Sequence, residues 1–95
     1  MASLNAINAV HATLLAATVD RITLTAPLGN RIKVTNRDSS TAIYYRFDGI
    51  DPTVGGAESF VVLPADSDTF APLTIPVDIR VIATLGVGYS VTSVV

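Results

Sequence analysis

The sequence predicts an all-β domain, an antiparallel β-sandwich of Ig-like or jelly-roll-like type with roughly six to eight strands and an N-terminal arm. Apolar and polar residues alternate with a period of two from Val19 onward, which is typical of half-buried strands. Clusters of Gly, Pro, Asp and Asn interrupt this alternation at short intervals, as turns do. A chain of 95 residues suits one domain with one core.

The first 18 residues are predicted as an arm, and residues 19–95 as the sandwich domain. Leu4, Ile7 and Leu14 would fit the stripe of a short helix, which the many alanines also favour. Thr13 and Thr18 instead lead directly into a strand, and we prefer an extended arm that ends in a strand.

Alternation predicts three strands in the first half of the domain, around Ile22, Ile32 and Ile43. A turn at residues 27–30 separates the first two, and a polar break at residues 36–40 separates the next two. Residues 48–56 are rich in Gly, Pro and Asp and are predicted to form a long loop.

The second half continues the pattern. Residues 60–63 are apolar at every position, which predicts a strand covered on both faces, and residues 64–69 read as another break. Alternation returns over residues 77–84 and 89–95. Pro76 cannot donate to a strand ladder, so it marks the start or the free edge of the first of these strands.

Composition excludes several classes of function. Hydrophobic residues make up 49% of the chain and charged residues 15%, against about 25% charged in typical globular domains. Such a small domain cannot bury all of this apolar surface, so we expect part of it to face another chain. The net charge is −2 with six dispersed basic residues, a pattern that argues against nucleic-acid binding. No stretch approaches the roughly 20 apolar residues of a membrane helix, and no basic region precedes the apolar start, so we expect synthesis in the cytoplasm without export.

No group of residues carries a recognisable catalytic site, and we expect no enzyme activity, metal or cofactor. His11 is the one histidine, the chain has no cysteine, and no Gly-x-Ser-x-Gly elbow presents a nucleophile. Asp48 and Asp51 in one loop, with Asp66 and Asp68 in another, could supply oxygens to Ca²⁺. The same aspartates are good turn residues, and this second interpretation is preferred.

Candidate interface residues lie in the arm and in the predicted strand around Ile43. Tyr44 and Tyr45 are adjacent and should point to opposite faces, one into the core and one outward. An exposed Tyr44 beside Arg46 would suit an interface, although a purely structural cross-strand role is equally compatible. The candidate interface residues are Leu4, Ile7, Val10, Leu14, Tyr44 and Arg46.

Several stretches resemble small virion proteins of tailed bacteriophages. They are residues 8–14 (NAVHATL), 18–24 (TVDRITL), 32–37 (IKVTNR), 42–56 (AIYYRFDGIDPTVGG) and 89–92 (YSVT). The resemblance implies a head-associated structural protein that decorates or cements the capsid, with the major capsid protein or other virion subunits as partners. It also implies a homo-oligomer on the particle and location in the virion. Alternatives are a tail or head–tail connector component, or a sandwich module that binds surface glycans.

Overall fold

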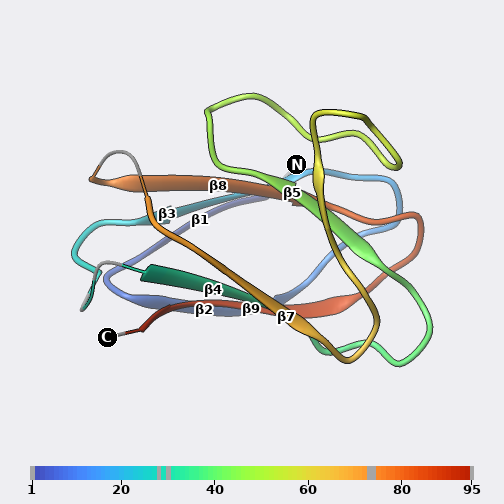
Figure 1. The fold of residues 1–95 in the computed structure, drawn as a ribbon, viewed down its shortest axis with the longest axis horizontal. Coiled ribbons are helices and arrows are strands. Elements are labelled where there is room, and N and C mark those ends of the chain that lie inside the picture. Colours follow the sequence, from blue (N-terminus) through green and yellow to red (C-terminus); the bar gives the residue numbers. More distant parts are fainter. Residues whose placement is uncertain (1, 28, 30, 73–74, 95) are drawn as a thin grey trace.

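A computed structural model of the chain describes residues 2–27, 29, 31–72 and 75–94. Within these residues it contains nine strands and no helix (Figure 1). The strands are β1 (Ala2–Ala6), β2 (Ala9–Thr13), β3 (Asp20–Leu24), β4 (Arg31–Asn36), β5 (Ile43–Arg46), β6 (Phe60–Val62), β7 (Ser67–Phe70), β8 (Val77–Ile82) and β9 (Gly88–Val94).

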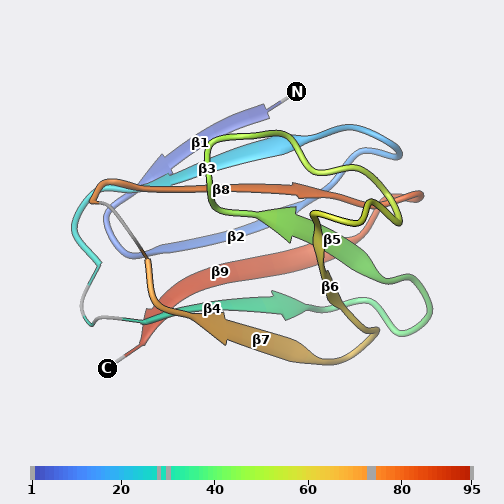
Figure 2. The same ribbon diagram turned by 45° about the horizontal axis from the view of Figure 1, so that its top comes forward.

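The strands form two sheets that pack face to face (Figure 2). The five-stranded sheet has the order β1-β3-β8-β5-β6, and the four-stranded sheet has the order β2-β9-β4-β7. All neighbouring strands are antiparallel except β1 and β3, which are parallel. The predicted all-β sandwich is therefore confirmed.

The order of the strands is that of a jelly roll. The pairs β2–β9, β3–β8, β4–β7 and β5–β6 form one long antiparallel ribbon that turns back on itself between β5 and β6. Successive pairs of this ribbon belong alternately to the four-stranded and the five-stranded sheet. This arrangement distinguishes a jelly roll from an Ig-like sandwich.

The alternation of apolar residues explains the core. In β4, β5 and β8 every second side chain is buried between the sheets, which makes one face of each strand apolar. Tyr45 is 1% exposed whereas its neighbour Tyr44 is partly exposed, so the predicted division of the two tyrosines is correct. β8 begins directly after Pro76, as predicted.

The N-terminal residues are extended, as preferred over a helix, and they contribute strands to both sheets. β1 pairs with β3 in the five-stranded sheet, and β2 pairs with β9 in the four-stranded sheet. Leu14 follows β2 and is 1% exposed. Residues 2–14 are thus part of the sandwich, in which β1 and β2 each form one edge of a sheet.

The strand predictions were wrong at two places. Residues 60–63 were expected to be covered on both faces, but only Val62 is buried, because β6 is the last strand of its sheet. Residues 64–69 are predicted to be a break, but strand β7 begins within them, at Ser67, and extends to Phe70. This strand also lies at a sheet edge, where polar residues such as Asp68 are tolerated and the alternation is weak. Strands β1 and β7 together bring the number of strands in the described residues to nine, above the six to eight expected.

Candidate functional site

The loops at one end of the sandwich are held together by backbone hydrogen bonds. The amides of Leu14 and Ala17 each donate a 2.8 Å bond, to the carbonyls of Val87 and Ala83 respectively, which joins the β2–β3 loop to the β8–β9 loop. The amide of Ala65 donates to the carbonyl of Asp38 at 2.8 Å, which joins the β6–β7 loop to the β4–β5 loop. All four loops lie at the same end of the sandwich, at the right of Figure 1.

This end carries three exposed leucines. Leu15 is 70% exposed, and Leu63 and Leu85 are each 59% exposed. They come from three different loops, the β2–β3, β6–β7 and β8–β9 loops. We call Leu15, Leu63 and Leu85 the leucine end. Leucine side chains that stay in water on a folded domain forgo the free energy of burial, so their concentration at one end indicates a binding surface.

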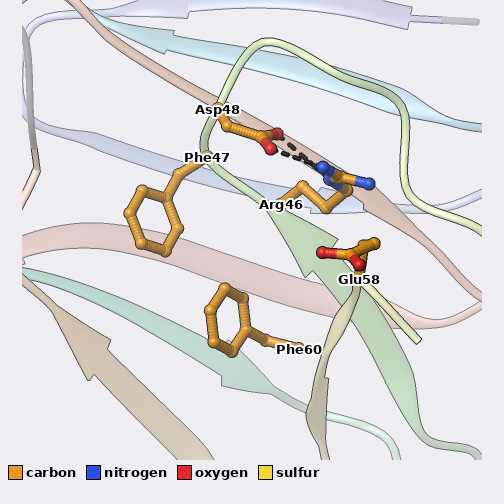
Figure 3. Close-up of a pocket in the computed structure, with 5 residues that line it drawn as sticks. All are labelled: Arg46, Phe47, Asp48, Glu58 and Phe60. Atoms are coloured by element: carbon orange, nitrogen blue, oxygen red, sulfur yellow. Dashed lines mark hydrogen bonds and ion pairs between the residues drawn. The ribbon is translucent and has the colours of Figure 1, made fainter. Parts of the chain in front are cut away.

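A second feature lies where β5 and β6 meet the loop between them. A cleft of about 240 Å³ is lined by Arg46, Phe47, Asp48, Glu58 and Phe60 (Figure 3). The guanidinium of Arg46 donates two hydrogen bonds to the carboxylate of Asp48. This bond raises the pKa of Arg46 and lowers that of Asp48. The cleft is smaller than the roughly 300–1,000 Å³ of typical small-molecule sites.

The phenylalanines of the cleft belong to an aromatic cluster that connects the two sheets. Phe47 stacks on Phe70 of β7 with ring centroids 4.0 Å apart. Phe60 stacks on Tyr45 at 5.4 Å and on Phe47 at 5.6 Å. Phe60 is nevertheless 50% exposed, so the aromatic cluster reaches the surface there.

The carboxylates considered for Ca²⁺ have other partners. Asp48 bonds Arg46, and Asp51 accepts a 2.7 Å hydrogen bond from Arg80. Asp68 accepts a 2.6 Å bond from the phenol of Tyr45, and Asp66 accepts a 2.8 Å bond from the amide of Ser67. In the part of the chain that the structure describes, no three His, Cys, Asp or Glu residues gather as a metal site.

His11 lies on β2 opposite Ser90 of β9, and its Nδ1 is 2.7 Å from the serine hydroxyl. This is a cross-strand contact on the outer face of the four-stranded sheet. No carboxylate bonds the imidazole among the described contacts, so the pair lacks the third group that orients a catalytic histidine.

The candidate interface residues are not brought together. Val10 and Leu14 are in the core, at 9% and 1% exposure, because β2 closes one side of the sandwich. Leu4 packs partly against the core, whereas Ile7 is 66% exposed in the β1–β2 turn. Tyr44 and Arg46 lie on the outer face of β5, on the far side of the five-stranded sheet from Val10 and Leu14.

Sequence reasoning did not find the leucine end or the aromatic cluster. Both assemble residues that are far apart in the chain, and no local spacing signals them. Comparison of the chain with protein families, with curated proteins and with solved structures finds no match. None of the described segments is a helix of the length and apolarity needed to cross a membrane.

Proposed function

We propose that this chain is a structural virion protein that binds and stabilises a phage capsid and catalyses no reaction. The setting rests on the resemblance of its sequence to small head-associated phage proteins. The observation that carries a binding role is the leucine end, with three exposed leucines on three adjoining loops.

The geometry of the leucine end suits attachment to a repeated site on a shell. Its loops are tied to one another by backbone hydrogen bonds, so little conformational entropy is lost when a partner covers them. Exposed charged side chains lie on the loops of this end, among them Arg37 and Asp66. An apolar centre with a polar rim is the usual composition of a protein–protein interface.

The test compares binding of variants to capsids that lack the protein. In the double variant Leu15→Ser/Leu85→Ser, the apolar contact is removed from the leucine end. The control Ile50→Ser/Val54→Ser changes two exposed apolar residues in the β5–β6 loop, which is none of the four loops of the leucine end. We expect the first variant to bind at least about 10-fold more weakly, and the control to bind like the unchanged protein.

Circular dichroism and melting temperature would confirm that both variants fold. Equal binding of the two variants would contradict a role for the leucine end. Particles without the protein that resist heat and osmotic shock as well as complete particles would contradict a cementing function. Gold label on the tail in place of the head would assign the protein to the tail or connector.

Glycan binding is a second candidate, which the cleft supports. Phe60 presents a half-exposed ring beside Arg46 and Glu58, and an aromatic face with nearby hydrogen-bonding groups can hold a sugar ring. Titration with a glycan panel should then perturb the NMR signals of Phe60 but not those of Phe70. Silence across the panel would remove this candidate.

A further inference from the structure

The sandwich has four edge strands, and one of them differs from the others. β1 and β6 end the five-stranded sheet, and β2 and β7 end the four-stranded sheet. Polar side chains lie along β1 (ASLNA), β2 (AVHAT) and β7 (SDTF), whereas β6 (FVV) has none. Natural proteins protect free edges with charged residues, proline, bulges or very short strands, and of these devices β6 has only its length of three residues. Its apolar edge can therefore accept another strand.

The two exposed side chains of β6 lie on opposite faces of the sheet. Phe60 pairs with Tyr45 on the inner face, and Val61 pairs with Tyr44 on the outer face. Phe60 is 50% and Val61 47% exposed, because no strand follows β6 in the sheet. Both faces of a strand added here would continue an apolar surface.

Across the sandwich β6 packs against β4, the inner neighbour of β7. The space between the two edges β6 and β7 is occupied by the aromatic cluster, in which Phe47 of the β5–β6 segment stacks on Phe70 of β7. The core therefore reaches the surface along this side. An added strand would remove Phe60 from water and lengthen the core by one strand.

We propose that the strand added at this edge is β6 of a second copy of the chain, antiparallel across a two-fold axis centred on Val61. The inference deepens the proposed function, since it specifies how neighbouring copies join on a particle. Directly opposite residues in an antiparallel pair share a face. Phe60 of each copy then lies opposite Val62 of the other, an aromatic–β-branched pair of the kind that stabilises sheets.

The ends of β6 are compatible with this pairing. In the same register Glu58 lies opposite Pro64 of the second copy, so no like charges face each other across the axis. The net charge of −2 adds little long-range repulsion between copies. A two-fold contact of this kind uses the same patch on both subunits, as most homodimers do.

The contact is small. An edge of three residues buries much less than the roughly 800 Å² per partner of a standard interface, so we expect a dissociation constant on the order of 100 μM in solution. Copies bound to adjacent sites on a shell would be held at a high local concentration, where such a contact forms readily.

Sedimentation equilibrium on the full chain, up to about 1 mM, tests the proposal. Val61→Lys places a charge at the centre of the edge and should weaken dimerisation at least about 10-fold, as edge lysines do. Val61→Thr keeps a β-branched side chain and should dimerise nearly normally. Ser67→Lys adds the same charge to β7 and should have no effect on the dimer.

Hydrogen exchange of the unchanged protein gives a readout without any variant. Those amides of residues 60–62 that point away from β5 should exchange more slowly as concentration rises, whereas the amides of β1, β2 and β7 should not change. A protein that stays monomeric at 1 mM, a Val61→Lys variant that dimerises normally, or protection at another edge would each overturn the proposal. Two assays separate this proposal from the proposed function. If the unchanged protein binds capsids but forms no dimer, edge pairing is refuted and the proposed function is not. If the leucine-end variant binds capsids as well as the unchanged protein does, the role of the leucine end is refuted and edge pairing is not.

Discussion

The phenol of Tyr89 donates a 2.9 Å hydrogen bond to the carboxylate of Asp20, and both side chains are buried, at 0% and 3% exposure. The bond joins β9 of the four-stranded sheet to β3 of the five-stranded sheet. Tyr45 and Asp68 make the reverse connection, from β5 to β7, at 2.6 Å. Two Tyr–Asp bonds therefore tie the sheets across the core, in a chain without cysteine.

Tyr89→Phe should lower the free energy of unfolding by about 1–3 kcal/mol, because it leaves the buried Asp20 carboxylate without this donor. Urea denaturation measures the change. Tyr44→Phe is the matched control and should cost less than about 0.5 kcal/mol, since Tyr44 is partly exposed on the outer face. In a double-mutant cycle with Asp20→Asn, additive effects of the two changes would show that the bond is not energetically coupled.

Stability should fall at alkaline pH. Burial and the bond to an aspartate raise the pKa of both Tyr45 and Tyr89 well above the usual value near 10. The folded state thus holds these protons more tightly than the unfolded state does. The contribution of these two tyrosines to the free energy of unfolding is complete below pH 10. It is lost as pH rises above 10, at up to about 1.4 kcal/mol per pH unit for each tyrosine.

Urea denaturation between pH 8 and 11 measures this loss. Tyr89→Phe should remove its share of the slope, since phenylalanine does not ionise. A free energy of unfolding that does not change up to pH 11 would contradict the prediction.

Adjacent leucines test whether the N-terminal residues belong to the core. Leu14→Ala should lower the free energy of unfolding by about 2–5 kcal/mol, as for other buried leucines. Leu15→Ala should change it by less than about 0.5 kcal/mol, because this side chain is 70% exposed. Thermal or urea unfolding measures both. Similar costs for the two variants would show that residues 2–18 do not pack as described.

Asn36 joins β4 to the end of β6. Its side chain is 1% exposed, and its Nδ2 donates to the carbonyls of Thr41 at 2.9 Å and Val62 at 3.1 Å. Its Oδ1 accepts from the amide of Asp38 at 2.9 Å. Asn36→Ala should lower the free energy of unfolding by about 1–3 kcal/mol and speed hydrogen exchange at residues 60–62, because it leaves these backbone groups without partners.

The isosteric Asn36→Asp keeps the acceptor for Asp38 and loses both donors. The exposed Ser39→Ala in the same loop should have little effect on stability. Unchanged exchange at residues 60–62 in Asn36→Ala would mean that the side chain does not hold β6.

Much of the fold could be read from local alternation. The side chains expected to point inward from the predicted strands around Ile32, Ile43 and Val77 are buried, because the side-chain period of a strand does not depend on which strand lies beside it. The same alternation predicted the opposite orientations of Tyr44 and Tyr45. Turn residues marked most of the interruptions correctly, since Gly, Pro and Asp set backbone conformations locally.

Strand order, and everything that follows from it, depends on contacts between distant residues. The run Phe60–Leu63 has the composition of a central strand, yet it lies at an edge, and only the pairing of β5 with β8 on its other side places it there. Phe47, Phe60 and Phe70 meet because the ribbon turns back between β5 and β6. The leucine end arises in the same way, from loops that adjoin only once the sheets have formed. Local residue patterns specify which face of a strand is apolar, whereas the edges and ends available to a partner are properties of the assembled sandwich.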